Sequence, residues 1–203
     1  GIGLASAQQL AKIGAQVTLC ARNKTDLDAA LVTLPGSGHT RIVADFDQPY
    51  QLESAVNSHI SEHGPFQILI NNSGGPAGGP LFAADSDQFL VAMQRHLVCN
   101  QRLVQALVPG MKESGYGRIV NVTSTSGLYG NFGQANYSAA NMPVVGLSST
   151  LATEGAKRNI RVRGMVRVRA RTDSEQRNIT VRGREGCVLD TSDDSDDRPG
   201  VCL

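Results

Sequence analysis

A serine, a tyrosine and an asparagine form the pattern with the clearest chemical meaning in this chain. Ser124 comes thirteen residues before Tyr137, and Asn141 follows four residues later. A phenol titrates near ~10, so a tyrosine that works near neutral pH needs help from its surroundings. If Tyr137 begins a helix, residue 141 lies one turn on, on the same face. A lysine there could hold a cofactor and favour the phenolate, whereas this chain has an uncharged amide.

The rest of the chain alternates between strand-like and helix-like sequence. Short apolar runs cover residues 16–20, 41–44, 67–70 and 118–122, and helical periodicity covers residues 4–13, 52–62, 89–111 and 136–157. Strands that are apolar throughout and alternate with helices indicate a parallel sheet covered on both faces. We therefore predict an α/β fold of the Rossmann-like, doubly wound type.

A glycine turn opens the chain, because Gly1-Ile2-Gly3 leads straight into the first predicted helix. In a dinucleotide-binding fold such a turn follows a strand and sets a helix N-terminus against a pyrophosphate. No strand precedes the turn here, so we expect a fragment or processed product whose sheet lacks its first strand. Backbone groups left unpaired at the two inner edges would make the isolated chain marginally stable.

Arg22 follows the predicted strand at residues 16–20. An acidic residue near this point would bind the ribose of NAD, whereas an arginine accommodates the 2′-phosphate of NADP. The position therefore favours NADP over NAD. A solvated surface arginine is the alternative interpretation.

Charge, hydropathy and cysteine spacing argue against several other classes of function. The 203 residues carry a net charge of +1, which gives no global attraction to nucleic acid or membranes. No apolar run reaches the ~18 residues needed to span a bilayer. The four cysteines form no CxxC pair, and His39, His59 and His63 have no partners at ligand spacing. We therefore predict a reduced, cytoplasmic chain without a metal site.

The sequence changes character after residue 162. Arginines crowd between residues 158 and 184, acidic residues crowd after residue 189, and no aromatic residue follows Tyr137. We therefore divide the chain into a domain at residues 1–162 and a disordered tail at residues 163–203. A basic arm for nucleic acid is the less favoured alternative, because no aromatic side chain could stack on bases. An out-of-frame or spliced sequence would also explain the change.

Several of these motifs together resemble the short-chain dehydrogenase/reductase family. Gly1-Ile2-Gly3 is similar to the end of its TGxxxGIG loop, and Ala44-Asp45-Phe46 to the segment whose aspartate meets the adenine. Asn71-Asn72-Ser73-Gly74 resembles its NNAG motif, and Ser124 and Tyr137 match its catalytic serine and tyrosine. The resemblance covers about residues 1–162, and several ordered motifs are more specific than any one alone.

The resemblance implies a role for each matched residue. Tyr137 would give a proton to the carbonyl oxygen in reduction or remove one in oxidation, and Ser124 would hydrogen-bond that oxygen. His96 stands where the family has a helix asparagine that holds a water in the proton relay. Asn141 stands in the place of the family's lysine. The family's segment that reaches the nicotinamide is not found after residue 162.

The resemblance also implies a substrate class. Residues 127–137 are close to the 3-hydroxyacyl-CoA dehydrogenase domains of peroxisomal multifunctional enzymes, and residues 74–80 to 3-oxoacyl-carrier-protein reductases. We expect NADP-dependent reduction of a 3-oxoacyl or related ketone. The alternatives are an NAD-dependent 3-hydroxyacyl dehydrogenase, with a peroxisomal location, and a non-catalytic remnant or binding partner. The family pairs through its long helices, here residues 89–111 and 136–157, so a homo-oligomer is possible.

Overall fold

The computed structural model describes residues 1–167. Its strands are β1 (Thr18–Ala21), β2 (Thr40–Val43), β3 (Ile68–Asn71), β4 (Gly117–Ser124) and β5 (Ile160–Arg167). Its α-helices are α1 (Ile2–Lys12), α2 (Lys24–Leu31), α3 (Pro49–His63), α4 (Ser86–Met93), α5 (Cys99–Glu113), α6 (Thr125–Tyr129) and α7 (Ala135–Gly155). Short helical segments are η1 (Leu81–Ala83), the π-helical η2 (Gln94–Val98) and η3 (Ala156–Arg158).

The strands form two separate parallel sheets. β1 pairs with β2, and β3, β4 and β5 form a second sheet in that order. All of these pairings are parallel, which confirms the predicted α/β architecture. Among residues 1–167 no strand joins β1 to β3, so each keeps an unpaired edge. In a doubly wound sheet a central strand would lie between these two edges.

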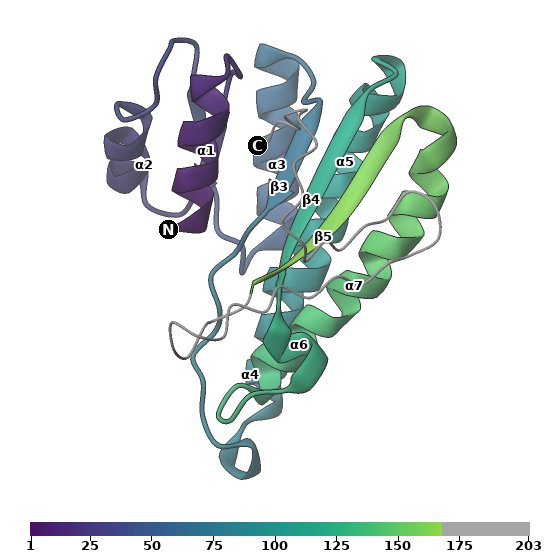
Figure 1. Cartoon of the computed structure of the whole chain (residues 1–203). Coiled ribbons are helices and arrows are strands. Elements are labelled where there is room, and N and C mark those ends of the chain that lie inside the picture. Colours follow the sequence, from purple (N-terminus) through teal and green to yellow (C-terminus); the bar gives the residue numbers. More distant parts are fainter. Residues whose placement is uncertain (168–203) are drawn as a thin grey trace, which may run out of the picture.

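Helices cover both faces of the strands (Figure 1). The larger core joins α3, α5 and α7 to β2–β5 and includes Leu52, Leu107, Met111, Ile119 and Val162. A smaller core packs α1 against the other face of β3. The apolar runs predicted as strands thus bury side chains on both faces, as parallel strands must.

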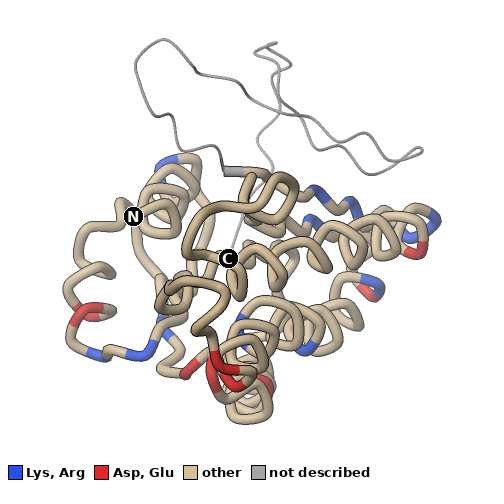
Figure 2. The backbone as a smooth tube through the Cα atoms, turned by 90° about the horizontal axis from the view of Figure 1, so that it is seen from below, with Lys and Arg blue, Asp and Glu red and all other residues tan. Residues whose placement is uncertain are grey.

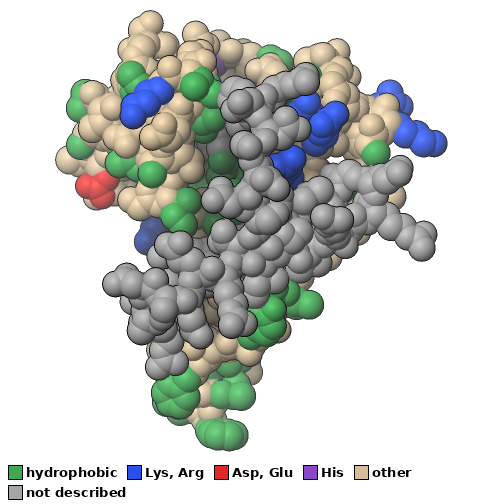
Figure 3. All heavy atoms as spheres, in the orientation of Figure 1, with side chains coloured by type: hydrophobic (Ala, Val, Ile, Leu, Met, Phe, Trp, Pro, Cys, Tyr) green, Lys and Arg blue, Asp and Glu red, His purple; other side chains and the backbone are tan. Residues whose placement is uncertain are grey.

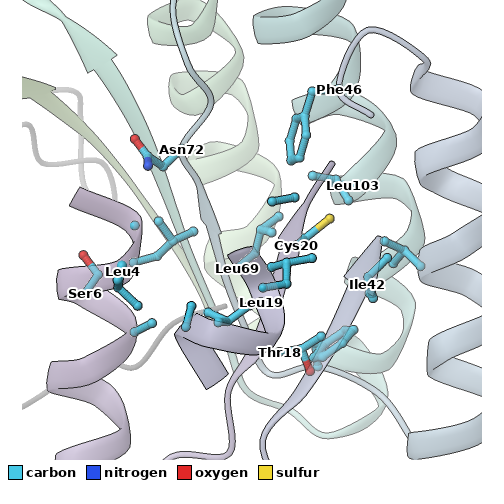
Figure 4. Close-up of a pocket in the computed structure, with 18 of the residues that line it drawn as sticks. Leu4, Ser6, Thr18, Leu19, Cys20, Ile42, Phe46, Leu69, Asn72 and Leu103 are labelled. Atoms are coloured by element: carbon cyan, nitrogen blue, oxygen red, sulfur yellow. The ribbon is translucent and has the colours of Figure 1, made fainter. Parts of the chain in front are cut away.

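An apolar cavity of about 370 Å³ lies between the two sheets (Figure 4). Its walls come from α1, from β1 and β3, and from the core face of α5, with Leu4, Leu19, Leu69 and Leu103 among the lining residues. Phe46 closes part of it. The cavity therefore occupies the space between the unpaired edges of β1 and β3.

The predicted domain boundary at residue 162 falls inside β5 and has to move. β5 continues to Arg167 and pairs with β4 as far as Ser124. The arginine-rich sequence alternates here, so that Val162 is buried while Arg161 and Arg163 are exposed, which is the pattern of a half-buried strand. The remainder of the predicted tail, residues 168–203, lies outside the described residues.

Surface charge gathers on no single face of the described chain. In Figure 2 the lysines and arginines are spread over several elements and interspersed with acidic residues. No helix within residues 1–167 is long and apolar enough to cross a membrane, and the same residues contain no group of three metal-ligating side chains. Cys20 and Cys99 are free, and burial raises the pKa of both thiols to about 12. Cys187 and Cys202 lie beyond the described residues.

Candidate active site

Tyr137 lies in the first turn of α7, and a glycine-rich segment contacts the residues around the start of this helix. The Asn136 amide donates to the carbonyl of Ala77 at 3.1 Å, and its oxygen accepts from the Tyr137 backbone N–H at 2.8 Å. A Cβ on Gly78 would come within 2.5 Å of the Gly133 carbonyl oxygen, so only glycine fits this approach. The segment at residues 74–79 therefore fixes where α7 begins and where Tyr137 stands.

A cavity of about 200 Å³ opens beside Tyr137. Its lining comes from distant parts of the sequence and includes Ile2, Asn72, Ser73, Gly74, His96, Thr123, Tyr137 and Asn141. The structure thus brings together half of the catalytic and cofactor-binding residues that the sequence predicted. Of the predicted catalytic residues, Ser124 is the one outside this lining.

His96 is the most informative polar group in the site. Its side chain is buried, and its Nδ1 hydrogen-bonds the Ser73 hydroxyl at 2.8 Å. Its Nε2 is buried without a hydrogen-bond partner, and its ring meets the Tyr137 ring edge-on at 5.3 Å between centroids. Burial, followed by the Arg95 charge, lowers the pKa of His96 to about 4. His96 is therefore a neutral imidazole with one ring nitrogen free to exchange a proton or bind a water.

Asn141 faces the same cavity but is occupied by local hydrogen bonds. Its amide donates to the Tyr137 carbonyl at 2.9 Å, and its side-chain oxygen accepts from the Thr123 hydroxyl at 3.2 Å. The Thr123 hydroxyl also lies 3.1 Å from the Asn141 carbonyl. These bonds tie α7 to the end of β4 and bring no positive charge to the phenol. Thr123 was not among the predicted site residues, although its position next to Ser124 was a usable signal.

Ser124 ends β4 and caps the next helix. Its Oγ accepts from the Ser126 backbone N–H at 3.2 Å and lies 3.2 Å from the Ser126 hydroxyl. A serine at this position satisfies a helix-terminal N–H, which explains its place in the turn without any substrate. Its neighbour Thr123 lines the cavity, whereas Ser124 does not, so Ser124 borders the site only along the chain.

The glycine turn lies next to the motif after β3. A Cβ on Gly3 would stand 3.1 Å from the Asn72 amide nitrogen, and Ile2 shares the cavity wall with Asn72. Gly1 precedes α1 without any side-chain cap, so the first N–H groups of the helix have no side-chain partner. These features fit a dinucleotide: bare helix N–H groups and a close backbone approach lie beside the cavity that holds Tyr137.

The predicted adenine-side residues cluster at the ends of β1 and β2. Arg22 and Asp45 form a long, exposed ion pair of 3.9 Å, which contributes little to stability and leaves the guanidinium accessible. Phe46 packs into the 370 Å³ cavity. Asn71 was also predicted to bind the cofactor, and its amide donates to Asn121 on β4 at 2.8 Å, so it joins two strands. Its buried side-chain oxygen has no partner.

Protonation of His96 should make folding sensitive to acid. Because the pKa of His96 is lowered to about 4 in the folded chain and is near 6.5 when unfolded, its stabilising contribution is complete above pH 6.5. It is lost as the pH falls toward 4, and it amounts to roughly 3 kcal/mol. Urea unfolding at a series of pH values should show a shallower loss for His96→Asn, whose amide does not titrate. Burial also lowers the pKa of His59, so the difference between the two proteins isolates His96. Equal slopes in the two proteins would contradict the assignment.

Comparison with known proteins points to one family. The family model for short chain dehydrogenases matches residues 1–180. The match runs past residue 162, so the family pattern extends farther than the motifs indicated, into residues outside the described structure. A crystal structure of L-sorbose reductase from Gluconobacter frateurii, complexed with NADPH and L-sorbose, is 29% identical with a TM-score of 0.76. That similarity covers 82% of this chain and 64% of the reductase.

Curated relatives include a multifunctional peroxisomal protein and a bacterial reductase. The peroxisomal hydratase-dehydrogenase-epimerase of Saccharomyces cerevisiae is 37% identical over 80% of this chain, which spans only 19% of that protein. A 3-oxoacyl-[acyl-carrier-protein] reductase of Vibrio cholerae is 33% identical over 80% of this chain and 66% of its own length. The chain therefore spans about a fifth of the first relative and just under two thirds of the second.

Proposed function

Because the chain belongs to the short chain dehydrogenase family, we propose that it is an NADP(H)-dependent oxidoreductase that reduces a 3-oxoacyl thioester to the 3-hydroxy compound. The observation that carries the proposal is the 200 Å³ cavity, in which Tyr137 and His96 lie beside Ile2 and Asn72. A proton-transfer pair thus stands next to the turn suited to a dinucleotide. The accessible Arg22 supports the phosphorylated cofactor.

The residues of this chain would supply binding, orientation and proton transfer, while the nicotinamide supplies the hydride. Tyr137 gives its phenolic proton to the substrate oxygen as that oxygen gains charge. Ser124, which borders the site along the chain, donates a hydrogen bond to the same oxygen once its bond to Ser126 is exchanged. His96 restores the proton to Tyr137 through its free Nε2, directly or through one water, with Ser73 as its partner on Nδ1. A neutral imidazole suits this relay because it can accept on one nitrogen and release from the other.

Exposed apolar side chains near the site support an acyl substrate. Leu81, Phe82, Leu90, Tyr129 and Phe132 are all largely exposed, and Phe82 and Phe132 almost wholly so. They belong to η1, α4, α6 and the α6–α7 connection, and Figure 3 shows hydrophobic side chains gathered at this end of the molecule. Contiguous apolar surface of this kind marks binding sites. An acyl chain would cover it while the oxo group enters the cavity.

Two other functions have an observation in their favour. The similarity to a peroxisomal hydratase-dehydrogenase-epimerase favours an NAD-dependent 3-hydroxyacyl dehydrogenase and a peroxisomal rather than a cytoplasmic location. The occupied, uncharged side chain of Asn141 favours a non-catalytic remnant that binds cofactor only. The predicted self-association through α5 and α7 fits all three functions.

Cofactor binding and turnover should be measured separately on the purified chain. Nucleotide fluorescence tests binding of NADPH and NADH, and absorbance at 340 nm follows cofactor oxidation with a short 3-oxoacyl thioester. The proposal expects tighter binding of NADPH and measurable turnover. Binding without turnover would favour the remnant, and faster reaction of NAD with a 3-hydroxyacyl thioester would favour the dehydrogenase.

The Tyr137→Phe variant should bind NADPH as the parent chain does and lose turnover, because it keeps the ring but has no proton to give. Tyr116→Phe is the matched control, since Tyr116 packs under Arg118 at the opposite end of β4. Equal turnover in Tyr137→Phe and Tyr116→Phe would remove Tyr137 from the reaction.

A further inference from the structure

The helix that carries His96 is interrupted by a π-helical segment, η2 (Gln94–Val98), where the sequence predicts one continuous helix. Such segments are rare and are found frequently at functional sites, because the extra residue turns neighbouring side chains toward different partners. Here Arg95 and His96, adjacent in sequence, bond to two different loops.

Of the ion pairs that the described residues form near the site, the one between Arg95 and Asp47 has the shortest distance. Its Nε and Nη2 donate to the two carboxylate oxygens of Asp47 at 2.7 and 2.6 Å, and its Nη1 lies 3.4 Å from the Gly75 carbonyl. Both partners are largely shielded, with 17% and 27% of their side chains exposed. The Arg95 hydrogen bonds hold the pKa of Asp47 below its usual range, so the pair is charged at neutral pH. A two-pronged bond of this kind fixes orientation as well as distance.

A second contact ties the same loop to the same helix. One turn after Arg95, the Cys99 thiol donates to the Phe46 carbonyl at 3.0 Å. The loop from Asp45 to Asp47 is therefore held at two points, and Asp45 itself accepts from the Asp47 backbone N–H at 2.9 Å. Gly75, the other residue to which Arg95 donates, lies against Tyr137, since a Cβ there would stand 3.4 Å from the tyrosine ring.

We propose that Arg95 is a positioning residue that couples the loop at Asp45–Asp47 to the proton-transfer pair His96 and Tyr137. This inference rests on the proposed function, because the loop is where the sequence places the adenine half of the cofactor. Binding there would shift the loop, and the two-pronged bond between Arg95 and Asp47 would transmit that shift to the segment that bears His96. Arg95 also donates a long hydrogen bond to the carbonyl of Gly75, which lies next to the tyrosine ring.

Three variants separate the effect of the two-pronged Arg95–Asp47 bond from the effect of the Arg95 charge. Arg95→Lys keeps the positive charge but cannot make the two-pronged bond, and Arg95→Gln loses both. Arg102→Gln is the matched control, because Arg102 pairs with Glu53 at 3.3 Å between α5 and α3 with similar exposure. The charged groups acting on His96 are Arg95 and Asp47, and its hydrogen-bond and ring partners are Ser73 and Tyr137.

The first readout is the His96 ring signal in NMR spectra of labelled chain without cofactor. We expect the ring shifts and tautomer of His96 to change in both Arg95 variants and to stay as in the parent chain in Arg102→Gln. An unchanged signal in Arg95→Lys would show that charge alone suffices and would overturn the positioning role. An equal change in Arg102→Gln would overturn it too, by pointing to a general loosening.

The second readout uses adenosine 2′,5′-bisphosphate, which has the adenine end of NADP but no nicotinamide. In the parent chain we expect it to move the His96 signal, and in Arg95→Lys to bind without moving it. Binding to the parent chain with no change at His96 would overturn the coupling. Failure to bind at all would count against the NADP proposal, while the cofactor-free spectra would still decide the role of Arg95. In turnover, Arg95→Lys should lower kcat about tenfold with the thioester KM unchanged, and Arg102→Gln should do neither.

Discussion

Replacing Asn141 with lysine is expected to raise kcat for thioester reduction about 100-fold, because a cation within a few ångströms of a phenol favours its ionised form. Asn141 is buried and borders the 200 Å³ cavity, so a longer side chain has open space into which it can extend. The present amide instead bonds to the Tyr137 carbonyl and to Thr123 and brings no charge to the phenol. A phenol that ionises closer to neutral pH is the better proton donor at working pH.

Asn141→Met separates charge from bulk, since methionine has similar length and no charge. The lysine variant should gain rate and move the phenol-dependent limb of its pH–rate profile to lower pH, while the methionine variant should do neither. Initial rates at a series of pH values, with saturating NADPH, make the comparison. If the two variants had the same rate, the missing charge would not be what limits this site.

The long elements were predictable because each has a strong local signal. The apolar runs became β1 to β4 within one or two residues. Three of the long periodic stretches became α1, α3 and α7, and the fourth, at residues 89–111, is divided among α4, η2 and α5. α2 was missed because its apolar residues are few and only Leu27 is buried. Asn23, which accepts from the Thr25 and Asp26 N–H groups, was a usable signal for its start. α6 has five residues, too few for a periodic pattern.

Many residues of the site could be predicted from the sequence, but the hydrogen bonds and ion pairs between their side chains could not. Tyr137, His96, Asn72 and Ser73 were chosen from separate motifs, and the structure places them around one cavity. The bond between Ser73 and His96 joins residues 23 positions apart, and that between Asp47 and Arg95 joins residues 48 apart. No local pattern records such pairs, since they depend on how β2, β3 and η2 meet in space. The π-helical turn itself left no trace in the periodicity of residues 89–111.

The gap between the sheets should be the main determinant of stability. We expect a variant carrying an apolar strand and a short glycine loop ahead of Gly1 to unfold at a temperature about 10 °C higher than the parent chain. A four-residue strand would match β1 and β3, pair with both free edges and fill the 370 Å³ cavity (Figure 4). Each aliphatic side chain buried there stabilises by roughly 1.5–3 kcal/mol. Ordering each residue costs about 1–2 kcal/mol, so the net gain is about 3 kcal/mol.

The control for this variant is the same extension with two of its apolar residues replaced by proline, which can neither donate to the free edges nor keep the strand regular. Calorimetry gives the unfolding midpoints, and hydrogen exchange reports whether amides of β1 and β3 become protected. The strand variant should gain both, and the proline variant neither. Equal midpoints for the two variants would show that the cavity between Leu19 and Leu69 does not accept a strand, and that the two sheets are stable as separate units.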